Sequence, residues 1–338
     1  MREKVYYQDG KIDLRLENSS WSYMVGFVGD SAAVVLDVGC ACGDLGLALK
    51  KSRNAEIYGL EYNEGSIEVA LATGVYEKIV QCDLDLLKEG NFCEWNGKFD
   101  YLICGDIFEH LRDPANVLKN LARFLKSNGK LIASIPNVAH MYIKAQLLTD
   151  RFEYTETGLL DETHIHLFTR HSISEFMSTC GFAIHECRFT MCGKNEWHEY
   201  DPWVKLSYFE KDSIFTDWHS YVCQYVFVAG KSEIEADELF RRNLGKLNIN
   251  EDNAPQYILD YKHQMGADIG VSPLVTLAAD RDRILADRNA LAADRNLLVA
   301  DRDRILADRD RILNSTCWKI TAPLRYLMDR IKRFMKKS

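Results

Sequence analysis

The chain has 338 residues, of which 47% are hydrophobic and 27% charged, so it can bury a core and is not expected to be disordered. Its 42 Lys+Arg and 50 Asp+Glu residues give a net charge of -8, which argues against a nucleic-acid partner because phosphates need a basic face. The last 24 residues carry seven basic and one acidic residue, a net +6, which leaves -14 for everything before them. The two ends of the chain are therefore predicted to meet different surroundings.

The spacing of the cysteines and the composition of the first residues bear on the compartment in which the protein works. The ten cysteines are irregularly spaced and include no C-x-x-C pair, so no disulfide framework is expected. The first ten residues lack the apolar core of a signal peptide, and no stretch approaches 18 uncharged apolar residues. These features predict a protein of the reducing cytoplasm.

Short β-rich segments alternate with helical patterns from about residue 19 to residue 231. One predicted helix, 116–126, follows an Asp113-Pro114 start and stops before Asn128-Gly129. Such alternation predicts an α/β fold with a doubly wound, mostly parallel, seven-stranded sheet, the last two strands being candidates for an antiparallel edge. The predicted strands are 33–38, 56–60, 78–81, 99–104, 130–135, 182–189 and 221–229.

The pattern changes after residue 231, where a connector (232–275) includes a charged helix at 233–248. A seven-residue repeat then runs for five copies from Leu277, within a segment assigned to 276–314, and predicts a long helix. Its apolar columns occupy adjacent heptad positions, so the seam also holds small or polar residues. A homo-oligomeric coiled coil is the preferred interpretation, and a single solvated or folded-back helix is the alternative.

The final segment, 315–338, has an apolar stripe beside a basic remainder. This composition is typical of a helix that lies in an anionic membrane interface. The alternative is a basic tail that packs on the acidic domain. The stripe consists of Leu324, Leu327, Met328, Ile331, Phe334 and Met335.

The strongest ligand signal follows the first predicted strand as Asp37-x-Gly39-x-Ala41-x-Gly43. Small residues at alternate positions let the backbone turn tightly and approach a bound cofactor. A nicotinamide fingerprint, G-x-G-x-x-G, would need glycine where this chain has Ala41 and Asp44. Asp44 would also place a carboxylate where a pyrophosphate meets the helix N-terminus. The loop therefore suits a cationic or zwitterionic ligand better than a diphosphate.

This segment resembles the first motif of class I S-adenosylmethionine-dependent methyltransferases, and segments 99–114 and 125–137 match later motifs of that family in order. The resemblance covers about 200 residues and implies a methyltransferase domain at 1–231 with S-adenosylmethionine as cofactor. It implies that Glu61, 24 residues after Asp37, binds both ribose hydroxyls and that Asp83 accepts the adenine amino proton. The cofactor-binding residues implied are Asp37, Gly39, Cys40, Ala41, Gly43, Glu61, Asp83, Leu84 and Asp106.

Two further segments, 136–140 and 160–169, are similar to a bacterial subgroup associated with surface-polysaccharide and glycan biosynthesis, and so is the ending 315–325. This narrower resemblance implies a glycan acceptor, by association and not by chemistry.

The methyl donor is already activated because it is a sulfonium. The protein must therefore mainly position the acceptor and remove its proton. A sugar hydroxyl is a poor nucleophile at neutral pH, so a nearby imidazole is valuable. His110 follows the fourth predicted strand at the carboxyl edge of the sheet, and His164 lies in the polar segment 161–166. Both are catalytic candidates. The alternative for segment 161–166 is a structural lid whose polar groups bond one another.

Asp106, Glu109 and His110 could hold Mg²⁺ or Mn²⁺, as in the resembling ubiquinone-pathway O-methyltransferases. Glu-His at this place is also common in the wider family without metal. A metal site is therefore not favoured.

The preferred function is O-methylation of a sugar on a surface polysaccharide or its lipid-linked precursor, by a cytoplasmic enzyme with a peripheral contact to the inner face of the cell membrane. One alternative is an O-methyltransferase of a small lipophilic acceptor such as a quinone. Another is a non-catalytic assembly factor with a methyltransferase fold. Asp106-Ile-Phe-Glu stands where nucleic-acid amino-methyltransferases usually carry Asp/Asn-Pro-Pro-aromatic, so no nucleic-acid substrate is expected.

Overall fold

The computed structural model describes residues 12–16, 18–29, 32–191, 206–250, 252–254, 256, 259–260, 302, 304 and 307. The chain divides into two units, Met1–His263 and Gln264–Ser338, and all helices and strands named below belong to the first. Three residues of the second unit are described, Arg302, Arg304 and Ala307, and each is helical. The rest of the heptad repeat and the tail 315–338 lie outside the described residues, so oligomerisation and membrane binding stay predictions.

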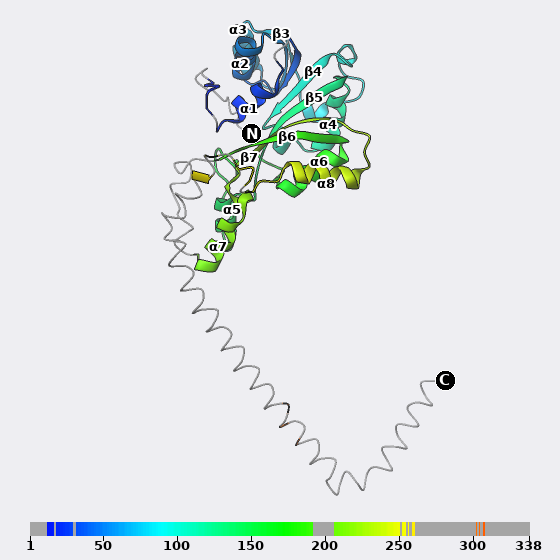
Figure 1. The fold of residues 1–338 in the computed structure, drawn as a ribbon. Helices are drawn as coiled ribbons and strands as arrows, with labels where there is room; N and C mark the ends of the chain where they lie inside the picture. Colours follow the sequence, from blue (N-terminus) through cyan, green and yellow to red (C-terminus); the bar gives the residue numbers. More distant parts are fainter. Residues whose placement is uncertain are drawn as a thin grey trace, which may run out of the picture. The chain divides into compact units, whose positions relative to one another are not determined.

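Seven strands form one sheet in the order β3-β2-β1-β4-β5-β7-β6 (Figure 1). The neighbours from β3 to β5 pair in parallel, whereas β7 lies between β5 and β6 and is antiparallel to both. The predicted seven-stranded, mostly parallel α/β fold is thus confirmed. The strands are Val34–Val38 (β1), Glu56–Glu61 (β2), Tyr76–Gln81 (β3), Phe99–Gly105 (β4), Leu125–Pro136 (β5), Phe182–Thr190 (β6) and Gln224–Lys231 (β7).

Both faces of the sheet are covered, as a doubly wound fold requires. Successive side chains of a strand point to opposite faces, and the neighbours Val35 and Leu36 are both fully buried. The face that includes Val35 packs on helices α1 (Ser20–Phe27) and α2 (Asp44–Arg53), where Val25 and Leu49 join the same apolar cluster. The other helices are α3 (Glu64–Ala72), α4 (Pro114–Ala122), α5 (Met141–Leu148), α6 (Arg170–Thr179), α7 (Tyr208–Thr216) and α8 (Ala236–Lys246).

Helix α4 differs from its prediction at its C-terminal end. The Asp113 side chain accepts a hydrogen bond from the Asn116 N–H at 3.0 Å, and Pro114 opens the helix as expected. The prediction that the helix continues to residue 126 is wrong, because α4 ends at Ala122 and Leu125 already pairs with Phe99 in the sheet. The long-range strand pairing overrides the local helical pattern.

Helix α8 falls within the predicted charged helix at 233–248 and packs against α6 and β6. Its Asn243 is fully buried, and the side-chain carbonyl accepts a hydrogen bond from the Ile184 N–H at 2.8 Å. The Asn243 amide donates to the Phe182 carbonyl and the Ser178 hydroxyl. This one side chain therefore joins α8, α6 and β6.

Seven of the described cysteines are free thiols, whereas Cys223 is disulfide-bonded, a pairing that the cysteine spacing did not predict. Among the described residues, none of the helices is both long enough and apolar enough to span a bilayer.

Candidate active site

The loop from β1 to α2 turns on residues with left-handed backbone. Gly39, Ala41 and Gly43 have φ values of 71°, 43° and 89°. The N–H groups of Gly39 and Cys40 both donate to the carbonyl of Leu60 in β2, at 2.7 and 3.1 Å. The predicted motif residues therefore form a tight turn held against the end of the neighbouring strand.

Glu61 is the last residue of β2, and its side chain connects the turn after β1 to the end of β2. One carboxylate oxygen accepts the N–H of Ala41 at 2.9 Å. The other accepts the N–H groups of Tyr62 and Asn63 at 2.9 and 2.8 Å. Three backbone donors thus fix the position of the carboxylate that the resemblance assigns to the ribose hydroxyls.

Asp37 lies near the end of β1 and is 3% exposed. Its carboxyl group accepts a hydrogen bond from the Tyr76 hydroxyl at 2.7 Å. Burial raises the pKa of Asp37 to about 7. The Tyr76 hydrogen bond lowers this pKa, and the nearby Glu61 charge raises it further. Tyr76 is a site residue that sequence reasoning missed, because the third strand was predicted to begin only at residue 78.

Asp83 follows β3 and is exposed, and its side chain caps the short helix Leu84–Leu86 by accepting from the Asp85 N–H. Asp106 follows β4 with a φ of 54°, and its carboxylate accepts from the Ser134 hydroxyl at 2.9 Å and the Gln224 amide at 2.9 Å. Burial raises the pKa of Asp106 against the lowering effect of these hydrogen bonds and of His110.

An acidic residue therefore stands at the carboxyl end of each of four adjacent strands, β3, β2, β1 and β4. Parallel strands end at one edge of a sheet, where open α/β folds bind ligands. Ribose hydroxyls, an adenine amino group and a cationic methionine end offer donors or positive charge to such acceptors. The described residues at this edge therefore fit S-adenosylmethionine.

Gly46 in α2 has a specific reason to be glycine. A β-carbon added there would lie 2.4 Å from the hydroxyl oxygen and 2.5 Å from Cζ of Tyr76. Gly46→Ala is expected to displace the Tyr76 ring from Asp37 and to lower the free energy of unfolding by about 1–3 kcal/mol. Gly245→Ala in α8, where the new methyl meets nothing within 4 Å, should instead be neutral or stabilise by up to about 1 kcal/mol. Urea unfolding of both variants measures the contrast, and equal effects would contradict it.

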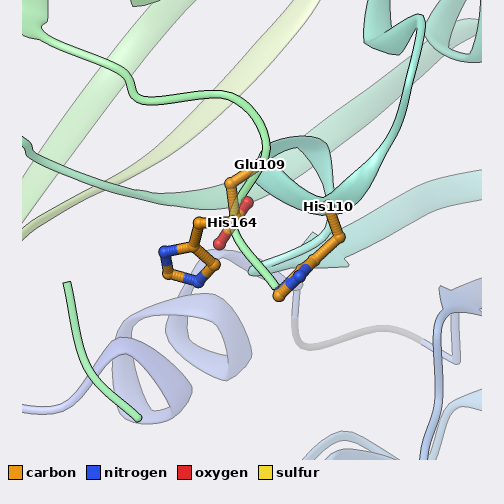
Figure 2. A group of neighbouring side chains, drawn as sticks. All are labelled: Glu109, His110 and His164. Carbon is orange, nitrogen blue, oxygen red and sulfur yellow. The ribbon is translucent and has the colours of Figure 1, made fainter. Parts of the chain in front are cut away.

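Three side chains meet beyond the end of β4 (Figure 2). Glu109 and His110 belong to the short helix Phe108–His110, and His164 comes from the segment between α5 and α6. One ligand-type atom from each lies within 4.8 Å of the others. The rings of His110 and His164 pack edge to face with centroids 4.8 Å apart. The two histidines predicted as catalytic are thus brought together, and Glu109 joins them.

Backbone hydrogen bonds hold this arrangement. The Glu109 carbonyl accepts the N–H groups of Ile165 and His166 at 2.9 and 3.0 Å. His110 Nδ1 lies 3.1 Å from the Thr163 hydroxyl, which donates to Asp161 at 2.7 Å. The hydrogen-bonded side chains expected of a structural lid are therefore present in segment 161–166, beside the candidate catalytic group.

Glu109 is fully buried, and neither carboxylate oxygen has a hydrogen-bond partner among the described residues. Burial and the nearby Asp106 charge raise its pKa well above the usual range. The set of Asp106, Glu109 and His110 weighed from the sequence is not the cluster that the structure assembles, because His164 takes the third place. Nothing in the local sequence joins His164 to Glu109, since their contact depends on how segment 159–166 docks.

The sheet order, the turn after β1 and the row of acidic strand ends define the class I S-adenosylmethionine-dependent methyltransferase fold. The chain belongs to the family described as "Methyltransferase domain", which matches residues 15–186.

Curated relatives carry a common name. The protein named "Ubiquinone biosynthesis O-methyltransferase" of Coxiella burnetii (strain RSA 493 / Nine Mile phase I) is 35% identical over 161 residues, covering 39% of this chain and 66% of that protein. The protein of the same name from Pseudomonas aeruginosa (strain LESB58) is 33% identical over 107 residues, covering 30% and 44%. The chain thus spans 66% and 44% of the length of these two relatives, less than two thirds of each. The YcgJ protein structure from Bacillus subtilis has a TM-score of 0.45 and 17% identity, covering 64% of this chain and 99% of that one.

Proposed function

We propose that the protein transfers the methyl group of S-adenosylmethionine to a hydroxyl oxygen of a small acceptor. One observation carries the proposal. Asp106 of the acidic row directly follows β4, and three residues later the same segment places Glu109 and His110 against His164. The cofactor edge and a group able to handle a proton are therefore adjacent along the chain and at the same edge of the sheet.

The cofactor-binding roles follow the strand ends. Glu61, with its carboxylate fixed by three N–H groups, would accept the ribose hydroxyls, and the exposed Asp83 would accept the adenine amino group. Asp37 and the turn Gly39–Cys40–Ala41–Gly43 would face the cationic methionine end. The half-buried Leu84 and Asp106 would flank the nucleoside.

When bound, the cofactor supplies a methyl group on a positively charged sulfur. In the transfer the methyl carbon–sulfur bond breaks, a carbon–oxygen bond forms, and the acceptor hydroxyl loses its proton. His164 and His110 are the proposed proton-handling groups, and the Glu109 backbone carbonyl holds the loop that places His164. The leaving group is neutral S-adenosylhomocysteine, so charge balances once the proton has left.

The names of the curated relatives favour the hydroxyl of a quinone precursor as the acceptor. The glycan acceptor preferred from the sequence rests on the resemblance of segments 136–140, 160–169 and 315–325 alone. Both acceptors present a hydroxyl, and the test therefore has to distinguish them.

Feeding cells a methyl-labelled donor and comparing wild type with Glu61→Ala tests the proposal. Label that depends on Glu61 is expected in lipid-extracted quinones. Label found in surface polysaccharide instead would move the acceptor to a sugar, and no Glu61-dependent label in either fraction would contradict O-methylation of these acceptors. Glu68→Ala on the exposed side of α3 is the matched control.

A further inference from the structure

The carboxylate of Glu109 is the least explained polar group in the described part of the chain. It is fully buried, and both oxygens lack a hydrogen-bond partner there. An uncompensated buried carboxylate is strongly unfavourable, and proteins normally pair it with a cation or give it a metal ion. The positively chargeable groups grouped with it are the imidazoles of His110 and His164.

Both imidazoles are oriented as metal ligands are. His164 Nδ1 lies 3.2 Å from the Leu159 carbonyl oxygen, and His110 Nδ1 lies 3.2 Å from the Thr163 carbonyl oxygen. A carbonyl can only accept, so Nδ1 carries the hydrogen in each ring and the lone pair of the neutral ring is on Nε2. An N–H donated to a backbone carbonyl is the usual support of a metal-bound histidine.

We infer that Glu109, His110 and His164 bind a divalent transition-metal ion. Two imidazoles and one carboxylate suit Zn²⁺, Mn²⁺, Fe²⁺ or Co²⁺, whereas Mg²⁺ prefers oxygen ligands. The ligand-type atoms already lie within 4.8 Å of one another, so side-chain torsions can close them around an ion. Its charge would compensate the buried carboxylate.

Asp106 is not a member of the cluster that the structure assembles, and its carboxylate makes its contacts elsewhere. The Ser134 hydroxyl and the Gln224 amide both donate to its carboxylate, at 2.9 Å each. Asp106 therefore has its partners on β5 and β7, while Glu109 has none among the described residues.

Three protein ligands leave coordination positions open, and the acceptor hydroxyl would occupy one of them. A divalent cation lowers the pKa of a bound hydroxyl and so favours loss of its proton. With the ion bound, His110 and His164 would promote this loss through the ion that they hold, and the proton would leave to solvent. This role rests on the proposed function, whereas binding of the ion itself does not.

The test uses the untagged full chain, freed of metal with a chelator and titrated with Co²⁺. Visible ligand-field absorption reports the site, and elemental analysis gives the stoichiometry. One ion per chain is expected, displaced by Zn²⁺ and not by equimolar Mg²⁺. Glu109→Gln, His110→Ala and His164→Ala are each expected to weaken binding by at least about 10-fold.

Two controls make the ligand set falsifiable. His166→Ala removes an imidazole two residues from His164 whose Nε2 faces the Arg112 carbonyl, and it should leave Co²⁺ affinity unchanged. Asp106→Asn should do the same. Loss of Co²⁺ binding in Asp106→Asn with retention in His164→Ala would overturn the proposed set, and so would a wild-type chain that binds neither Co²⁺ nor Zn²⁺. Urea unfolding checks that each variant is folded, and calorimetry of the wild-type chain with S-adenosylmethionine tests the cofactor site separately, so failure of the metal proposal is distinguishable from failure of the cofactor site.

Discussion

Glu61→Ala is expected to weaken S-adenosylmethionine binding by at least about 100-fold, which corresponds to roughly 2.7 kcal/mol. The carboxylate accepts the N–H groups of Ala41, Tyr62 and Asn63, so its removal leaves three backbone donors without their acceptor. It also removes one of the hydrogen bonds that hold the turn after β1 to the end of β2, together with the proposed ribose contact. Calorimetric titration of the purified protein measures the loss.

Two variants separate the contributions of Glu61. Glu61→Gln keeps one carbonyl oxygen and should retain part of the affinity, because that oxygen can still accept from the backbone. Glu68→Ala changes an exposed glutamate of α3 and should bind as wild type does. Wild-type affinity in Glu61→Ala would remove this residue from the cofactor site.

Cofactor binding is expected to release about one proton per chain below pH ~7 and almost none well above it. The raised pKa of Asp37, about 7, leaves this carboxyl largely protonated at lower pH. A cationic ligand nearby favours the ionised form, so binding lowers that pKa and expels the proton. The affinity should therefore rise as pH increases toward 7 and then level off. Calorimetry in two buffers of different ionisation enthalpy counts the protons.

Asp37 also determines the direction in which the free energy of unfolding changes with pH. Between pH 3.8, the ordinary pKa of an aspartate side chain, and about pH 7, the native state holds a proton on Asp37 that the unfolded chain has lost. The contribution of Asp37 to the free energy of unfolding therefore falls as pH rises through this window. Asp37→Asn should flatten both the stability profile and the proton release. A proton count that is the same in Asp37→Asn and wild type would assign the linkage to another group.

The row of acidic strand ends could be predicted because its information is local. Each acidic residue stands at or just beyond the end of a predicted strand, and parallel strands bring their ends together whatever lies between them. The end of α4 and the start of β5 could not be predicted, since Leu125 takes its conformation from pairing with Phe99, 26 residues earlier.

The cluster at Glu109 needed the tertiary structure. His110 was within reach of sequence reasoning as the neighbour of a strand end, but the contact of His164 with Glu109 joins residues 55 positions apart. Burial of Glu109 likewise depends on the segments that cover it and not on its neighbours in sequence. The hydroxyl of Tyr76 reaches Asp37 across 39 residues and leaves no local pattern either.

The hydrogen bonds from Ile165 and His166 to the Glu109 carbonyl involve main-chain atoms only. These two hydrogen bonds therefore do not depend on which side chains stand at positions 165 and 166. Ile165, whose side chain is 55% exposed, can be exchanged without loss of the bonds that place His164. Mutagenesis at position 165 could thus change the surface beside the site while the proposed proton-handling group, His164, stays in place.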